Sequence, residues 1–165
     1  MKQLSRVVWS EGMHLAPHHF QVQSRYFEDT AHFSTAALWF AAYGLIACEL
    51  DGEALKNGTV SLLHARGIFP DGLAFHIPEC DPGPAPRNIT ELFSPVSDRM
   101  SIYLTIPAHQ PDAAICALTP DSQSAQTRYV GEVTTVHDEN TGRDEKPVSL
   151  GRKNLRLALE SELDD

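Results

Sequence analysis

Residues 59–77 read TVSLLHARGIFPDGLAFHI, and their composition predicts a pair of β-strands. Both halves are rich in apolar and β-branched residues, and the second half alternates large apolar residues with smaller or polar ones. Between them, residues 70–72 (Pro-Asp-Gly) are typical of a tight turn, because proline presets φ, aspartate can bond its own backbone and glycine accepts the strained position. The stretch therefore predicts a β-hairpin with strands at 59–69 and 73–77.

A long helix is predicted ahead of this hairpin. Pro17 suits the first turn of a helix, and about twenty residues without glycine or further proline follow it. Phe20, Phe27 and Leu38 recur at helical spacing, which is typical of an amphipathic helix. We therefore expect a helix that spans residues 17–38.

Further strands are expected on both sides of the hairpin, where runs of β-forming or alternating apolar residues occur. These runs are residues 6–9, 45–50, 100–106 and 128–137, and Leu155, Leu157 and Leu159 alternate near the end. One helix followed by several strands with turns at short spacing predicts a mainly β fold, a β-sandwich with one N-terminal α-helix. The length suits a single domain, residues 1–165, that needs no metal or disulfide to be stable.

Charge and cysteine content narrow the possible functions. Asp and Glu total 22 against 13 Lys and Arg, and this net charge of −9 disfavours nucleic-acid binding, which needs positive charge. It equally disfavours a polybasic membrane-surface protein. Cys48, Cys80 and Cys116 lie far apart and form no C-x-x-C pair, so a reducing compartment is expected. Residues 36–48 form the longest apolar run, which is shorter than the ~20 residues of a membrane span and is expected in the protein core.

Motifs for catalysis are missing from the sequence. It contains no G-x-S-x-G nucleophile motif and no glycine-rich phosphate loop. Glu11, Glu28 and Asp29 are carboxylates near the predicted helix, where charged side chains are usually solvated. We therefore expect no enzymatic activity and no cofactor.

Three histidines near the helix start leave one alternative open. His14, His18 and His19 could form a small metal-binding or metalloenzyme site, since His14 and His18 are four residues apart, as on one helical face. Pro17 lies between them, however, so this spacing falls outside regular helix. There is also no H-E-x-x-H motif and no nearby cysteine. Structural or surface roles are therefore favoured for these histidines.

The segment 9–20 is unusual because it gathers large apolar residues around a glycine and a proline. Trp9, Met13, Leu15 and Phe20 are its apolar members. They either pin the segment to the protein's own core or face a partner, since Trp and Met are enriched in the cores of interfaces. A mixed apolar loop held by a rigid helix would make a suitable hot spot.

A family resemblance favours the interpretation that these apolar residues face a partner. Residues 8–26, VWSEGMHLAPHHFQVQSRY, resemble the N-terminal signature of the TssK family, the baseplate subunits of the bacterial type VI secretion system. The similarity continues at residues 43–45, 49–51, 65–72 and 154–157, in the expected order. The chain departs from the family pattern at His14 and His18, where an aromatic residue and a glutamine are common.

The resemblance implies a β-sandwich "shoulder" domain similar to that of phage receptor-binding proteins. It implies that this domain attaches trimers to a wedge of TssF and TssG, on the cytoplasmic side of the inner membrane. It also implies that the family's C-terminal neck and head, which contact the membrane complex, are absent from these 165 residues. No nucleic acid and no direct membrane insertion are expected.

We hypothesise that the apolar residues of segment 9–20 form or support the docking surface, and that two charged residues orient it. The full set is Trp9, Glu11, Met13, Leu15, Phe20 and Arg25. The face that meets the wedge, trimerisation of these 165 residues alone and the order of the 107–126 loop stay open at this point.

Overall fold

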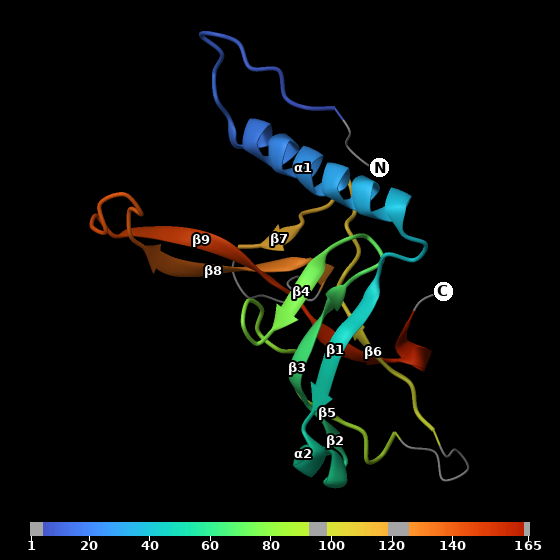
Figure 1. Ribbon diagram of the computed structural model, residues 1–165. Coiled ribbons are helices and arrows are strands. Elements are labelled where there is room, and N and C mark those ends of the chain that lie inside the picture. Colours follow the sequence, from blue (N-terminus) through green and yellow to red (C-terminus); the bar gives the residue numbers. More distant parts are fainter. Residues whose placement is uncertain (1–4, 93–98, 119–125, 164–165) are drawn as a thin grey trace. The chain divides into compact units, whose positions relative to one another are not determined.

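The computed structural model describes residues 5–92, 99–118 and 126–163 (Figure 1). The chain divides into two compact units, which are considered separately below. One comprises Met1–Ala47 with Ala65–His76, and the other comprises Cys48–His64 with Ile77–Asp165. The predicted mainly β class with one long N-terminal helix is confirmed, and within these described ranges the strands form four small sheets of two or three strands each.

The first unit contains the long helix α1 (Pro17–Leu38), whose bounds match the prediction. Pro17 occupies the first turn, and Nδ1 of His19 accepts a hydrogen bond from the Ala16 backbone N–H at 3.0 Å. This bond satisfies one of the donors that a helix start leaves without an intrahelical partner. The helix ends where Trp39 turns to extended geometry, with its N–H bonded to the Thr35 carbonyl at 3.2 Å.

The prediction of a strand at residues 6–9 is wrong. Residues 5–10 have no regular secondary structure, although Val7, Val8 and Trp9 favour strands. A strand needs a neighbour for its backbone groups, and none of the described strands pairs with this segment. Local β-propensity alone therefore does not make a strand here.

The predicted hairpin is confirmed. Strands β1 (Gly44–Leu50), β3 (Leu62–Ile68) and β4 (Ala74–Ile77) form a sheet in the order β1-β3-β4. In the turn, the Gly72 N–H bonds the Phe69 carbonyl at 2.8 Å, and the Asp71 carboxylate accepts the Leu73 N–H at 3.2 Å. Gly72 has φ +92°, a left-handed conformation that favours glycine.

The strand expected at 59–69 is interrupted at Ser61. Its first two residues form β2 (Thr59–Val60), which pairs with β5 (Arg87–Asn88). The Ser61 carbonyl instead accepts a hydrogen bond from the Asp51 N–H at 2.9 Å. Residues 59–60 and residues 62–68 therefore belong to two different sheets. A continuous apolar run in the sequence does not show where one strand ends and the next begins.

The second unit contains the remaining strands. Strand β6 (Ile102–Thr105) pairs antiparallel with β10 (Arg156–Leu159), and a 3₁₀ turn, η2 (Glu160–Glu162), follows. Strand β8 (Tyr129–Val136) lies between β7 (Cys116–Ala117), which is parallel to it, and β9 (Lys146–Lys153), which is antiparallel. Strands expected at 100–106 and 128–137 are thereby confirmed with shorter bounds. Of the expected 107–126 loop, residues 119–125 lie outside the described residues.

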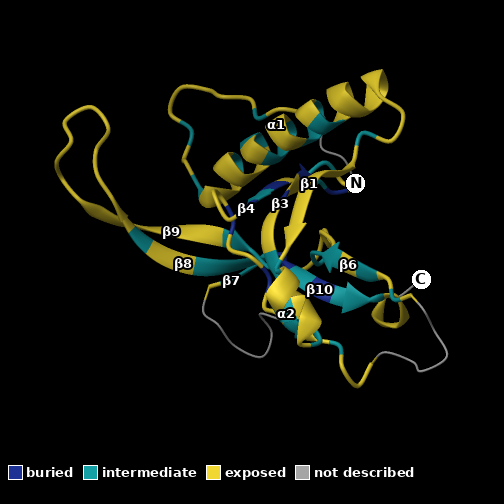
Figure 2. Cartoon of the chain, turned by 60° about the horizontal axis from the view of Figure 1, so that its bottom comes forward, coloured by how far each residue is buried: buried dark blue, intermediate teal, exposed yellow. Residues whose placement is uncertain are grey.

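The core of each unit is small. In the first unit, Phe69 and Phe75 are buried with ring centroids 4.9 Å apart, and Ala65 is also buried. In the second, the buried apolar residues are Val60, Ile77, Leu155 and Leu157. Helix α1 contributes no buried residue (Figure 2). Among the helices of the described ranges, none combines the length and apolar character needed to cross a membrane.

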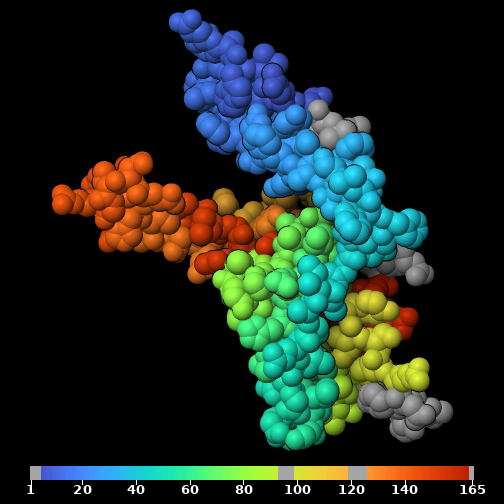
Figure 3. Space-filling view, viewed as in Figure 1, coloured from blue at the N-terminus to red at the C-terminus, as the bar shows by residue number. Residues whose placement is uncertain are grey.

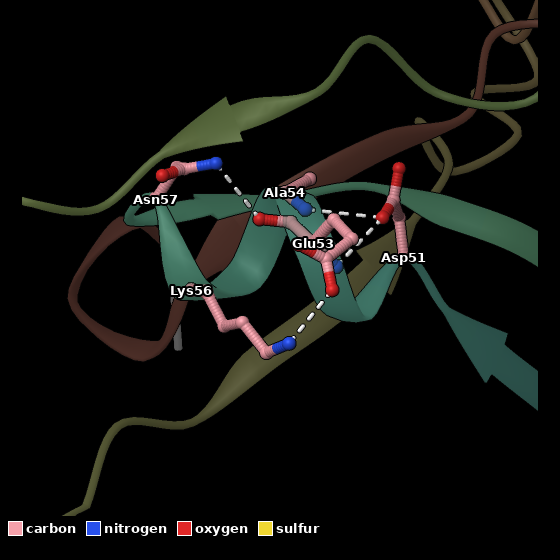
Figure 4. A network of polar contacts seen from close by, with 5 residues as sticks. All are labelled: Asp51, Glu53, Ala54, Lys56 and Asn57. Carbon is pink, nitrogen blue, oxygen red and sulfur yellow. Dashed lines mark hydrogen bonds and ion pairs between the residues drawn. The ribbon is translucent and has the colours of Figure 1, made fainter.

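A short helix, α2 (Gly52–Lys56), gives a first testable prediction (Figure 4). One carboxylate oxygen of Asp51 accepts the N–H groups of Glu53 and Ala54 at 2.9 and 3.0 Å. We expect Asp51→Ala to lower the free energy of unfolding by about 1 kcal/mol in urea titrations, because two N–H groups lose their acceptor. Lys56→Ala is the matched control, since it removes only an exposed ion pair to Glu53. It should change stability by a few tenths of a kcal/mol; equal losses would contradict the capping role.

Candidate interaction surface

The N-terminal segment approaches α1 through an irregular turn. Residues 11 and 12 form the turn, and the Met13 N–H points back to the Ser10 carbonyl at 3.4 Å. Gly12 has φ +76°, so a glycine is favoured at this position. Figure 3 shows the atoms of this segment, in dark blue, beside those of α1. The turn lets Trp9 reach the start of the helix.

Trp9, His19 and Phe20 form an N-terminal aromatic cluster. The Trp9 ring lies 6.2 Å from the His19 ring and 6.1 Å from the Phe20 ring, at tilted angles of 41° and 52°. These separations fall within the range of favourable aromatic pairs. Trp9 and Phe20 nevertheless stay 50% and 56% exposed, so each ring keeps one side toward solvent.

The other predicted docking residues differ in exposure and partners. Leu15 is 54% exposed, whereas Met13 is half-buried. Arg25 donates a hydrogen bond to Glu28 at 3.0 Å on its own helix. Glu11 is exposed, and the described residues offer it no hydrogen bond or ion pair. The structure thus brings Trp9 and Phe20 together and leaves three of the four apolar residues accessible.

The apolar face of helix α1 is exposed to solvent. Phe20, Phe27 and Leu38 share one face at helical spacing, and all three are exposed. The half-buried residues Tyr26 and Thr30 lie on a different face. An amphipathic helix normally buries its apolar stripe, so this face of α1 has no cover within the described chain.

A second exposed apolar region follows the helix, and its burial was predicted wrongly. The run 36–48 was expected in the protein core, but all of it except the half-buried Ala42 is exposed. Its large members are Leu38, Trp39, Phe40, Tyr43, Leu45 and Ile46, which we call the 38–46 patch. The sequence did not predict this exposed patch, because an apolar run has the same composition whether it packs inside its own chain or against another polypeptide.

The histidines do not form a metal site in the described part of the chain. No group of three or more His, Cys, Asp or Glu side chains there is placed to hold a metal ion. His19 instead uses Nδ1 at the helix start and its ring in the aromatic cluster. The metal-binding alternative therefore has no support from the geometry.

Among the residues that the structure describes, three side chains have clearly shifted pKa values, and each shift has a structural cause. Backbone N–H groups of Thr141 and Asn140 lower the pKa of the Asp138 carboxyl. The Leu159 N–H, followed by Arg87, lowers the pKa of Glu162. Burial raises the pKa of the Cys116 thiol. All three belong to turns or strands of the second unit and not to the N-terminal segment.

Comparison with known proteins assigns the family. A family model described as bacterial type VI secretion proteins VC_A0110, EvfL, ImpJ and VasE matches residues 19–165. The type VI secretion system baseplate component TssK1 of Pseudomonas aeruginosa PAO1 is 36% identical over 157 residues, covering 94% of this chain. The chain belongs to the TssK family. It spans 34% of the length of TssK1, about one third of that relative.

Solved structures of TssK proteins have the same fold. A crystal structure of TssK matches with a TM-score of 0.84 and 30% identity, covering 97% of this chain and 35% of that one. TssK in a cryo-electron microscopy structure of the TssK-TssF-TssG baseplate subcomplex matches with a TM-score of 0.83. At 22% identity, over 98% of this chain and 52% of that one, this second match supports the fold alone. The resemblance noted at residues 8–26 is thus confirmed at the level of the TssK family.

Proposed function

We propose that this chain is the part of a TssK-family baseplate subunit that docks the subunit onto a TssF–TssG wedge, with no catalytic step. The observation that carries the proposal is the exposure of Trp9, Leu15 and Phe20 in the segment that resembles the family signature. A solved assembly contains a related TssK together with TssF and TssG. A structural adaptor needs a rigid support with accessible anchors, and α1 with the N-terminal turn has that form.

The division of labour within the surface follows from the contacts. Trp9 is the main anchor, because it is half exposed while two rings hold its other side in place. Such preorganisation reduces the entropy that an anchor loses on binding. Leu15 adds apolar area, Phe20 supports Trp9, and Met13 completes the apolar contact. Glu11 and Arg25 orient the partner through charge, and Glu28 holds Arg25 in position.

The wider assembly belongs to the same proposal. Several copies join as a trimer, the baseplate lies on the cytoplasmic side of the inner membrane, and the neck and head of the longer subunit contact the membrane complex. The coverage of one third of TssK1 is consistent with this arrangement, since a longer relative has room for further domains.

Binding of the chain to purified TssF–TssG from the same source tests the docking surface. We expect Trp9→Ala and Leu15→Ala each to weaken binding by about 2 kcal/mol, roughly 30-fold, in biolayer interferometry. Val133→Ala is the matched control, because Val133 is an apolar residue on β8 of the second unit that is 69% exposed, more than either Trp9 or Leu15. Circular dichroism would verify the folds. Wild-type affinity in both N-terminal variants would overturn the docking assignment.

A further inference from the structure

His19 is not one of the predicted docking residues, yet it contacts the N-terminal segment at two places. Its ring lies 6.2 Å from the Trp9 ring, and the ring of the next residue, Phe20, lies 6.1 Å from the same tryptophan. Its Nδ1 accepts a hydrogen bond from the Ala16 N–H at 3.0 Å. One half-buried imidazole therefore links the start of α1 to the tryptophan of the proposed docking surface.

The start of α1 depends on His19 because Ala16 has no side-chain oxygen. Helices usually begin after Ser, Thr, Asp or Asn, whose side chains accept free N–H groups, and alanine is unfavourable at this position. In a capping box, a Glu or Gln side chain three residues later bonds the N–H of the capping residue. His19 occupies that later position, and its Nδ1 takes the place of the carboxylate or amide oxygen.

This hydrogen bond requires one form of the His19 ring. A ring nitrogen accepts a hydrogen bond only when it carries no proton, so the imidazole is neutral and its proton is on Nε2. In a protonated ring, Nδ1 could instead donate to the Ala16 carbonyl oxygen, 3.3 Å away. The Ala16 N–H would then lose its acceptor, and a positive charge would lie at the positive end of the helix dipole. Trp9 would compensate little, because its ring is tilted by 41° and lies at the ~6 Å limit of cation–π attraction.

From these contacts we infer that neutral His19 is a positioning residue of the docking surface, which holds Trp9 in place for the partner. The bond to the helix start and the contact with the Trp9 ring order the segment before binding, so less conformational entropy is lost in the complex. Protonation of His19 removes the bond on which this order depends. The inference rests on the proposed docking function, and it predicts binding that weakens as the pH falls.

Other titratable and charged groups lie near His19 in the sequence and have to be separated from it. The segment that carries Trp9 also carries Arg6, Glu11 and His14, all of which are exposed, and the exposed His18 precedes His19 on α1. None of the described residues forms an ion pair with His19. His18 gains a proton in the same pH range, so His18→Gln is the matched control for this effect.

Biolayer interferometry against purified TssF–TssG at about pH 8 and about pH 5.5 tests the inference, because histidine side chains gain a proton across this range. We expect the wild type to lose ~10-fold more affinity on acidification than His19→Gln, whose amide oxygen can accept the Ala16 N–H at either pH. His19→Ala should bind ~10-fold more weakly than the wild type at the higher pH. His18→Gln should respond to pH as the wild type does. Equal losses in the wild type and His19→Gln would overturn the inference.

Two measurements on the chain alone separate this inference from the docking proposal. NMR of the histidine ring nitrogens in the wild type should show His19 with a proton on Nε2 and none on Nδ1 at the higher pH. In a Trp39→Phe background, Trp9 is the remaining tryptophan, and its fluorescence should change when His19→Ala is added. A proton on Nδ1, or unchanged fluorescence in a variant that circular dichroism shows to be folded, would overturn the inference even if Trp9→Ala weakens binding. If both spectra agree with expectation while Trp9→Ala binds TssF–TssG normally, the docking proposal fails and the positioning of Trp9 by His19 stands.

Discussion

Replacing Asp81 with alanine should lower the free energy of unfolding by about 3–5 kcal/mol, the largest effect of any substitution considered. Asp81 is 5% exposed, and its two carboxylate oxygens accept hydrogen bonds from Lys153 Nζ at 2.7 and 2.9 Å. The Lys153 side chain is only 18% exposed. The variant would leave its ammonium group in a poorly solvated place without this counter-charge. Urea titration followed by circular dichroism measures the loss.

The adjacent residue on β9 supplies the control. Arg152 pairs with Glu132 at 2.6 Å, but both side chains are well exposed. Glu132→Ala should therefore cost at most about 1 kcal/mol, since solvent screens an exposed pair. If the two variants lost the same stability, burial would not be what makes the Asp81–Lys153 pair important.

Gly67→Ala should be the second most damaging change, with a loss of about 3 kcal/mol. A Cβ at this position of β3 would overlap the Gly44 carbonyl oxygen and come within 2.8 Å of Phe75 Cζ. A backbone oxygen cannot rotate away as a flexible side chain can, so the strands β1 and β3 would have to separate. Thermal and urea unfolding would record the loss.

Gly52→Ala is the appropriate comparison for Gly67→Ala. A Cβ on Gly52 meets nothing within 4 Å, and the residue lies at the start of α2 with an ordinary backbone. Alanine there should be neutral or stabilise by up to about 1 kcal/mol, because it restricts the unfolded chain. A stable Gly67→Ala variant would show that the β1–β3 pairing tolerates a side chain at this point.

Elements encoded by local chemistry could be predicted from the sequence. The helix at 17–38 follows from Pro17 and the spacing of its apolar residues, and the hairpin follows from Pro70, Asp71 and Gly72. The strand at 6–9 was wrong because pairing depends on a neighbour that local propensity does not report. The break at Ser61 was missed for the same reason.

The sequence likewise predicts one part of the candidate surface and misses the other. Composition and family resemblance both single out the N-terminal segment, where Trp9, Leu15 and Phe20 are exposed. Their role in docking stays a prediction. The apolar run 36–48, which contains the 38–46 patch, is predicted in the core from its composition. An apolar pattern indicates which residues favour burial, but it does not indicate which polypeptide buries them. The signal that could have exposed it is the lack of any charge between Asp29 and Glu49 directly after a helix.

None of the side chains of helix α1 is buried, and this has a consequence for the local stability of the helix. Most helices in proteins owe their persistence to tertiary packing, so α1 depends on whatever polypeptide comes to lie over it. Without such cover, α1 would open locally before the elements with buried side chains, and its amides would exchange sooner with solvent.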